Sequence, residues 1–281
     1  MGISARGAVR AARTRAEQRL TPYRTRRFST LTLPPPDIRL GGAHFLDDRT
    51  FVQSGMADVR RLERAFGLAA GDVVLDIGCG VGRLAIGVVA TENAAEYVGM
   101  DVAKDSIAWC RRNIQRHHPA LRFVHLDVAN ARYQPDGRAI DDSYRLPLPD
   151  ASVAVIHLYS VFSHMEADDV RRYLREFRRL LRPDGGVFLT AFLEDGVEDV
   201  AINPAGYGPL KWDGALHAVR FSRAFFERLV DDAGLSISRL DPHTETDEQS
   251  AVYLVRSHQG APHAATGSRE PSSSQAPAPG R

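Results

Sequence analysis

A glycine-rich loop between an apolar segment and a helical segment constrains the fold of this chain more than any other feature of its sequence. Residues 73–77 read Val-Val-Leu-Asp-Ile, and Gly78, Gly80 and Gly82 follow at alternate positions. A short apolar run before such glycines is typical of a buried strand, and a helical pattern follows the loop. Glycines here let the backbone approach a ligand closely at the carboxyl end of the strand. The loop therefore predicts a strand–loop–helix unit with a ligand site at its turn.

Patterns typical of strands and helices alternate along most of the chain. The segment from 222 to 234 has Ser222 in position for an N-cap and Gly234 at its C-terminal cap. Alternating strands and helices favour a parallel sheet with helices on both faces. We expect strands at 73–77, 97–100, 121–126, 152–158, 187–192, 235–240 and 251–255, and helices at 104–118, 167–182 and 222–234.

The composition divides the chain into three parts. Residues 1–40 are basic and end in the proline run 34–36, so we expect a mobile N-terminal extension. Residues 41–258 are expected to form one domain, and 43% hydrophobic residues in the whole chain are enough for a sizeable core. Residues 259–281 are rich in Ala, Pro, Ser and Gly, which predicts a disordered tail. Within the domain, an insertion at about 194–221 is polar and glycine-rich and is expected to shape substrate access.

Charge and cysteine content exclude several classes of protein. The 36 basic and 35 acidic residues nearly cancel, which removes the strong field of a dedicated nucleic-acid binder. Cys79 and Cys110 are too few for a disulfide framework or a four-ligand zinc site, so a reduced, cytoplasmic setting is expected. No run approaches the roughly 18 apolar residues of a membrane span. Only Lys104 and Lys211 are lysines, and this preference for arginine indicates a G- and C-rich, bacterial genome.

The beginning of the chain allows two interpretations. The first 30 residues contain eight arginines and a single acid, Glu17, and they lack the apolar stretch of a secretory signal. An arginine-rich, acid-poor start also resembles an organelle transit peptide, and this alternative stays open.

Aspartates mark the ends of three successive predicted strands. Asp76 closes the first strand, Asp101 follows the second and Asp127 follows the third. Because the carboxyl ends of parallel strands meet at one edge of a sheet, we expect the three acids at one ligand site. The carboxylate of Asp101 can accept hydrogen bonds from both hydroxyls of a ribose, which indicates an adenosine moiety. A dinucleotide fingerprint needs a third glycine three residues after the second, and Arg83 stands there.

Further motifs accompany the loop. Leu-Pro-Leu-Pro-Asp-Ala-Ser at 146–152 precedes the fourth predicted strand, and Leu-Arg-Pro-Asp-Gly-Gly at 181–186 precedes the fifth. With the glycine loop, they make the chain resemble the class I, seven-strand S-adenosylmethionine-dependent methyltransferases over roughly residues 56–256. Segments 127–135 and 159–165 resemble a bacterial branch that often acts on small metabolites or glycans. The resemblance implies an α/β three-layer sandwich with a seven-stranded, mostly parallel sheet, an antiparallel last strand and helices on both faces.

The same resemblance implies S-adenosylmethionine as the cofactor. Asp76 and the backbone at Gly78 and Gly80 would hold the methionine portion. Asp101 would bind the ribose, and Asp127 the adenine amino group, while the residue after it offers its backbone amide to the ring. The cofactor-binding candidates are Asp76, Gly78, Gly80, Gly82, Asp101, Val102, Asp127, Val128 and Tyr159.

Methyl transfer makes modest demands on the protein. It is an in-line displacement at a carbon already activated by a sulfonium charge, so the enzyme mainly aligns the nucleophile and excludes water. No metal ion or covalent residue is required. Aromatic rings favour the positive sulfur, and Tyr159 and Phe162 are candidates, although core packing explains Phe162 equally well.

A hydroxyl nucleophile generally needs a base, and histidine suits this task at neutral pH. His164 follows the fourth predicted strand and His217 precedes the last predicted helix, so both are catalytic candidates. Each has a structural alternative: His164 as a donor at a helix start, and His217 bonded to a backbone carbonyl. The pair at 117–118 is expected to be a solvated helix end, because adjacent helical residues point in different directions. The arginines of the 171–182 helix are likewise expected to form a solvated face.

These observations predict methyl transfer from S-adenosylmethionine to a small-molecule or glycan acceptor, with oxygen as the nucleophile. N- or C-methylation of a metabolite, cofactor binding without catalysis, and a nicotinamide-dependent oxidoreductase of the same fold stay as alternatives. Methylation of exocyclic amines in nucleic-acid bases is disfavoured, because residues 157–160 read His-Leu-Tyr-Ser where that class has Asn or Asp followed by Pro-Pro-Tyr.

Overall fold

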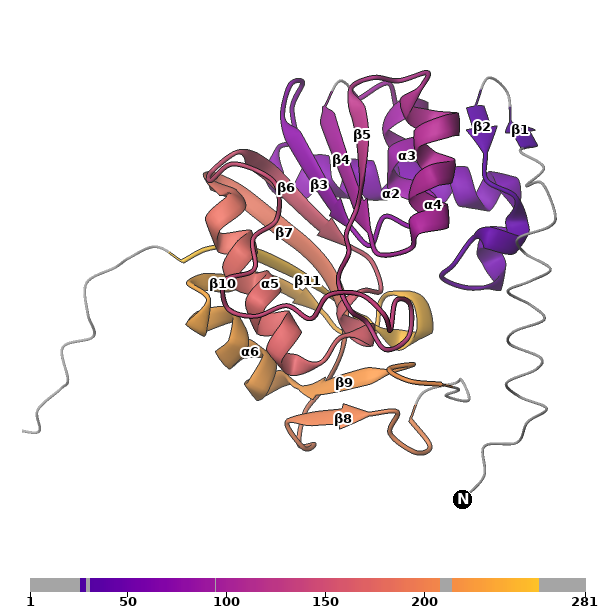
Figure 1. The fold of residues 1–281 in the computed structure, drawn as a ribbon. Coiled ribbons are helices and arrows are strands. Elements are labelled where there is room, and N and C mark those ends of the chain that lie inside the picture. Colours follow the sequence, from indigo (N-terminus) through magenta and orange to yellow (C-terminus); the bar gives the residue numbers. More distant parts are fainter. Residues whose placement is uncertain (1–25, 29–30, 94, 208–213, 258–281) are drawn as a thin grey trace, which may run out of the picture.

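A computed structural model of the chain describes residues 26–28, 31–93, 95–207 and 214–257 (Figure 1). Its helices are α2 (Asp48–Phe66), α3 (Arg83–Ala90), α4 (Lys104–Cys110, continued by the π-helical turn Arg111–Gln115), α5 (Ala167–Leu180) and α6 (Arg223–Asp232). Its strands are β1 (Arg26–Phe28), β2 (Leu31–Leu33), β3 (Val73–Ile77), β4 (Glu96–Asp101), β5 (Leu121–His125), β6 (Val153–Leu158), β7 (Leu181–Glu194), β8 (Val200–Ile202), β9 (Val219–Ser222), β10 (Leu235–Asp241) and β11 (Ser250–Arg256).

The main sheet confirms the predicted fold class. Seven strands lie in the order β10-β11-β7-β6-β3-β4-β5. Strands β3 to β7 pair in parallel, whereas β11 is antiparallel to both β7 and β10. The strands predicted from apolar segments are all present, although β7 begins earlier and ends later than expected. Helix α2 and the short strands β8 and β9 were not predicted.

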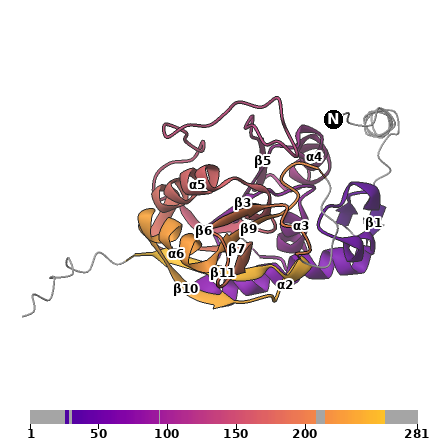
Figure 2. The ribbon, with the colours of Figure 1, turned by 90° about the horizontal axis from the view of Figure 1, so that it is seen from below.

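The two faces of the sheet are covered by different helices (Figures 1 and 2). Side chains alternate along β3, so that Val74 joins the apolar cluster of α2, α3 and α4, while Leu75 and Ile77 join the cluster of α5 and α6. This alternation directs Asp76 to the same face as Val74. The three-layer arrangement therefore places this acid between the sheet and the helix pair α2–α3.

Helices α2 and α3 cross in backbone contact. A Cβ atom at Gly55 would lie 2.4 Å from the carbonyl oxygen of Arg83, and one at Gly87 would lie 2.3 Å from the backbone of Gly55. Only glycine fits at this crossing. One turn away, the close approach brings Asp58 of α2 to Arg83 of α3, with Oδ2 and Nη2 2.6 Å apart.

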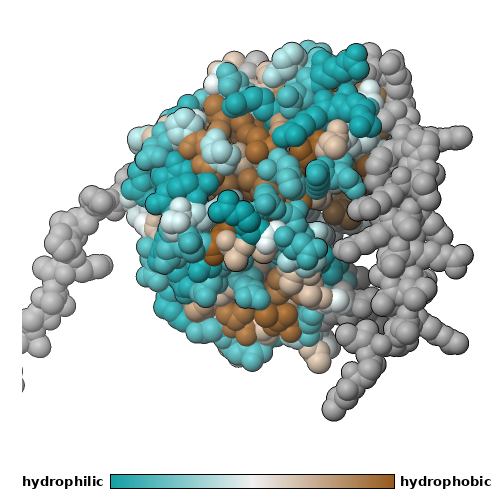
Figure 3. Space-filling view, viewed as in Figure 1, coloured by the Kyte–Doolittle hydropathy of each residue, from teal (hydrophilic) through white to brown (hydrophobic). Residues whose placement is uncertain are grey.

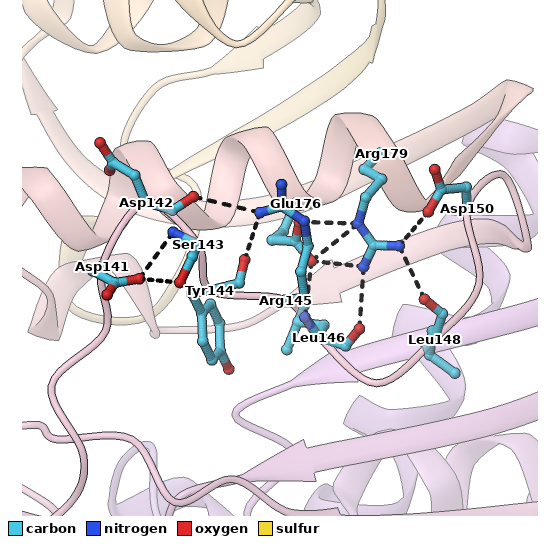
Figure 4. A network of polar contacts seen from close by, with 10 residues as sticks. All are labelled: Asp141, Asp142, Ser143, Tyr144, Arg145, Leu146, Leu148, Asp150, Glu176 and Arg179. Carbon is cyan, nitrogen blue, oxygen red and sulfur yellow. Dashed lines mark hydrogen bonds and ion pairs between the residues drawn. The ribbon is translucent and has the colours of Figure 1, made fainter.

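The connection from β5 to β6 is held on α5 by a polar network (Figure 4). Glu176, 2% exposed, accepts a hydrogen bond from the N–H of Leu146 and pairs with Arg179 at 2.6 Å. Arg179 also donates to two backbone carbonyls and to Asp150. These bonds fix the second half of the connection, whose first half borders the cavity described below.

Helix α6 largely follows its predicted ends. The side chain of Ser222 accepts a hydrogen bond from the N–H of Phe225, as expected for an N-cap. The C-cap residue is Ala233, and Gly234 follows it with a φ of +73°. Gly234 therefore ends the helix in the left-handed conformation that a C-terminal glycine cap requires.

The expected terminal extensions are only partly described. Leu33 is fully buried, and Arg39 is 5% exposed and donates to the carbonyl oxygens of Pro34 and Phe45, so this end of the expected N-terminal extension packs on the domain. The segment 1–25 and the predicted tail 259–281 lie outside the described residues. The domain boundaries stay predictions.

The visible surface in Figure 3 consists of apolar patches divided by polar side chains. Among the helices of the described residues, none is both long and apolar enough to cross a membrane.

Candidate active site

A cavity of about 520 Å³ opens at the carboxyl ends of β3, β4 and β6. Its walls come from the glycine loop, the segment after β4, the connection after β5, the turn after β6 and the N-terminal segment 40–45. The cavity thus lies where an open parallel sheet is expected to bind a ligand. Of the predicted site residues it is lined by Asp76, Gly78, Gly80, Asp101, Val102, Val128, Tyr159, His164 and His217.

The glycine loop has a backbone conformation that favours glycine at three positions. Gly78, Gly80 and Gly82 have φ values of +71°, +51° and +79°, a region that favours glycine. The N–H of Gly78 donates to the carbonyl oxygen of Met100 at 2.8 Å, which ties the loop to β4. A Cβ at Gly82 would lie 2.7 Å from Ile114, while one at Gly80 would meet nothing within 4 Å. Gly82 is therefore needed for packing, and Gly80 leaves backbone open toward a ligand.

Asp101 is fixed by the loop that it faces. Its Oδ2 accepts from the N–H of Gly80 and its Oδ1 from the N–H of Ala103, both at 2.7 Å. Burial raises the pKa of this carboxyl, and the two backbone hydrogen bonds oppose that rise. Each carboxylate oxygen has two lone pairs, so both can accept a further hydrogen bond from a ribose hydroxyl.

Asp76 is held by two neighbouring strands. Its Oδ2 accepts from the hydroxyl of Tyr97 at 2.6 Å, and Nδ1 of His157 lies 2.8 Å from its Oδ1. Gly99 makes the first contact possible, because a Cβ there would lie 2.8 Å from the Tyr97 hydroxyl. Asp76 is 3% exposed, so its orientation is set from beneath the cavity.

The third predicted acid lies apart from the other two. Asp127 is exposed, accepts from Gln134 at 2.9 Å and is not among the described residues that line the cavity. Val128 lines the cavity and is 5% exposed. The adenine contact of Asp127 stays a prediction.

The two aromatic candidates have different surroundings. The Tyr159 hydroxyl lies 2.8 Å from Oγ1 of Thr246, and the guanidinium of Arg83 lies 4.7 Å from its ring, which borders the cavity. Phe162 is fully buried beside Phe177, at 6.1 Å between ring centroids, in the core with α5 and α6. Core packing therefore accounts for Phe162.

The two histidine candidates lie close to one another. Nδ1 of His164 lies 3.0 Å from the carbonyl oxygen of Leu216, the residue before His217. A carbonyl only accepts, so Nδ1 carries the proton and Nε2 is the acceptor nitrogen. Burial lowers the pKa of His164 to about 4, although the bond to Leu216 opposes this, and nearby positive charge contributes. His164 is thus neutral at pH 7.

Sequence reasoning missed one set of buried polar residues next to this site. Asp58, Arg83, Tyr97 and His157 form ion pairs or hydrogen bonds behind Asp76, and each is at least largely buried. A histidine within the apolar run of β6 was the available signal, because such a group needs a buried partner.

Comparisons with known proteins agree with the fold. Residues 74–185 match the family model described as "Methyltransferase domain". A phthiotriol/phenolphthiotriol dimycocerosates methyltransferase of Mycobacterium ulcerans (strain Agy99) is 33% identical over 122 residues, 43% of this chain and 38% of that protein. A fatty-acid O-methyltransferase of Mycolicibacterium smegmatis (strain ATCC 700084 / mc(2)155) is 36% identical over 126 residues, 42% of this chain and 36% of that protein.

A solved structure shares the fold beyond these segments. The [4+2]-cyclase SpnF has a TM-score of 0.53 at 16% identity, covering 78% of this chain and 84% of that one. The chain spans 36% to 64% of the length of the first curated relatives it matches. Residues 74–185 therefore belong to a methyltransferase domain of the class I, S-adenosylmethionine-dependent type.

Proposed function

We propose that this protein transfers the methyl group of S-adenosylmethionine to a hydroxyl group of a small-molecule or glycan acceptor. One observation carries the proposal: the glycine loop with Asp101 and the pair His164 and His217 line the same cavity of about 520 Å³. The residues expected to bind the cofactor and the candidate proton acceptors thus border one cavity. The fatty-acid O-methyltransferase of M. smegmatis supports oxygen as the nucleophile.

The residues on the cofactor side fit an adenosyl group joined to an amino acid. Asp101 would bind the ribose hydroxyls, with its carboxylate held by two backbone N–H groups. Gly80 would let the backbone approach the methionine portion, and Asp76 would accept from its ammonium group. When bound, S-adenosylmethionine would supply a methyl carbon already activated by the positive sulfur. Tyr159, at the same wall, would present a ring to that charge.

The acceptor side needs a group that takes a proton. His217 is the first candidate, because it lines the cavity beside His164. Nε2 of His164 carries no proton at neutral pH and can accept one, but the pKa of about 4 makes this histidine a weak base. We assign His164 mainly to holding the 216–217 segment, and His217 to the proton transfer. The rest of the rate enhancement would come from alignment of the nucleophile with the methyl carbon.

The experiment has two stages. S-adenosylhomocysteine should stabilise the full chain against heat and bind in a one-to-one ratio, while NAD at equal concentration should not. Methyl-tritiated S-adenosylmethionine is then offered with panels of phenols, sugars and hydroxylated lipids, with matching amines as the N-methylation control. The proposal would be refuted if neither S-adenosylmethionine nor S-adenosylhomocysteine bound to the chain. Binding without labelled product on any acceptor would favour the alternative of a cofactor-binding protein without catalysis.

A further inference from the structure

A buried histidine lies directly beneath the cofactor side of the cavity. His157 of β6 is 1% exposed and stands opposite Asp76 in the parallel pairing of β6 with β3. Its Nδ1 lies 2.8 Å from Oδ1 of Asp76, and both residues border the cavity. His157 takes no part in the proton transfer that is proposed for His217.

A second carboxylate faces the other nitrogen of the ring. Nε2 of His157 lies 3.7 Å from Oδ2 of Asp58, which is 4% exposed on α2. Within the described part of the chain, this nitrogen makes no hydrogen bond. A neutral imidazole has one N–H, so its lone pair would face one of the two acids. Only the imidazolium presents an N–H to both, and the geometry therefore favours the charged ring.

Three carboxylates, those of Asp58, Asp76 and Glu245, face two guanidinium groups around the ring, and this excess of negative charge agrees with a positive ring. Asp58 also pairs with Arg83 at 2.6 Å and with Arg61 at 3.3 Å, and Arg61 pairs in turn with Glu245 at 2.8 Å.

The His157 ring is also enclosed by aromatic side chains. The rings of Phe188 and Tyr159 stack on His157, with ring centroids 5.5 and 6.4 Å away. The Tyr97 hydroxyl donates to the other oxygen of Asp76. Burial lowers the pKa of His157, but the carboxylates of Asp76 and Asp58 outweigh burial and raise it above its ordinary value.

We propose that His157, as an imidazolium clamped between Asp58 and Asp76, is a positioning residue for the cofactor. It holds the Asp76 carboxylate in the orientation that accepts the ammonium group of the methionine portion. Asp58 lies outside the matched methyltransferase segment 74–185 and is not among the described residues that line the cavity, so it reaches the cavity only through its contacts, the His157 ring and Arg83. The inference rests on the cofactor contact proposed above for Asp76.

The test measures S-adenosylhomocysteine affinity by calorimetry on the full chain. His157→Leu keeps an apolar side chain of related size but removes both donors, and it should weaken binding about tenfold to hundredfold, as for loss of a charged hydrogen bond. His157→Asn keeps a donor near the Nδ1 position and should bind within about threefold of wild type. Tyr97→Phe is the matched control, because it removes the uncharged donor to Asp76 and should cost less than His157→Leu.

A spectroscopic measurement separates positioning from general packing. With nitrogen-15-labelled histidine, both ring nitrogens of His157 should be protonated at pH 7 in wild type. Asp58→Asn should lower the protonated fraction and weaken S-adenosylhomocysteine binding together, while Tyr97→Phe should leave the ring protonated.

The binding and protonation measurements each support or contradict the role of His157. A folded His157→Leu variant that binds like wild type would overturn the role of His157, as would a neutral ring in the wild-type chain at pH 7. If His157→Leu does not fold, His157→Asn and Asp58→Asn decide, because Asp58→Asn must weaken binding for the inference to hold. A wild-type chain that does not bind S-adenosylhomocysteine would overturn the proposed function itself and this role with it.

Discussion

The Nδ1 of His164 donates to the carbonyl oxygen of Leu216, 3.0 Å away, and so joins the turn after β6 to the segment that enters β9. Leu216 has a φ of +46°, in the left-handed region that a bulky side chain rarely adopts. The histidine therefore supports a strained turn, and the next residue, His217, borders the cavity. The position of His217 therefore depends on the hydrogen bond that His164 makes to Leu216.

The half-buried His164 should make the fold sensitive to acid. The pKa of His164 is about 4 in the folded chain, against an ordinary value of 6.5, mainly because of burial. As pH falls from 6.5 toward 4, the unfolded chain takes up a proton that the folded chain does not, which destabilises the fold by on the order of 3 kcal/mol. Urea unfolding at pH 7 and pH 5 should show a smaller acid loss for His164→Asn than for wild type. Equal losses in the two proteins would contradict the assignment.

Removal of the acid at the end of β4 should weaken the cofactor. Asp101→Ala loses the acceptor for Gly80 and for a ribose hydroxyl, and hydrogen bonds of a charged group contribute about 1.5 to 3 kcal/mol each. Calorimetry with S-adenosylhomocysteine should show at least about a tenfold loss of affinity. Asp127→Ala tests the adenine contact in the same assay, and its exposed carboxylate predicts a smaller loss. An unchanged dissociation constant for Asp101→Ala would place the ribose elsewhere.

The sequence predicted the sheet well because its strands are short apolar runs followed by turn residues or helical patterns. Strands β3, β5 and β6 begin and end within a residue or so of their expected limits. Helix α2 was not predicted. Its packing on α3 depends on the contact between Gly55 and Gly87, and a local sequence pattern does not indicate a contact between residues 32 positions apart.

The positions of Gly80 and Asp101 at the cavity could be predicted, because a glycine-rich turn and a strand end are both local features. The polar contacts of Arg179 on α5 could not be predicted. Arg179 was expected on a solvated face, yet it bonds Glu176 and the β5–β6 connection, because a loop 30 residues away folds back over the helix. Long-range contacts of this kind are visible only in the assembled fold.

Two ion pairs on α5 with the same spacing should differ in their contribution to stability. Glu176 and Arg179 form a pair whose acid is 2% exposed and also accepts from the N–H of Leu146, while the acid of the pair Asp168 and Arg171 is exposed. Glu176→Ala should lower the free energy of unfolding by about 3 kcal/mol, because it leaves a buried donor without a partner and breaks a partly buried pair. Asp168→Ala should cost no more than about 1 kcal/mol. Urea unfolding that gives similar losses for the two variants would show that the network in Figure 4 does not anchor the connection.

The last prediction concerns the proton acceptor, and it needs an acceptor substrate from the panel described above. His217→Ala should lower the rate of methyl transfer about 100-fold to 10,000-fold, the usual contribution of a general base, and leave S-adenosylhomocysteine affinity nearly unchanged. His164→Ala should have a smaller effect on the rate, because its pKa of about 4 makes it a weak base and its bond to Leu216 acts on the position of His217. His164→Asn, which keeps a donor for that carbonyl, should recover part of the loss, whereas an alanine cannot. If His217→Ala keeps near-native turnover between pH 6 and 9, alignment alone, or an acceptor that is already deprotonated, becomes the better account of the reaction.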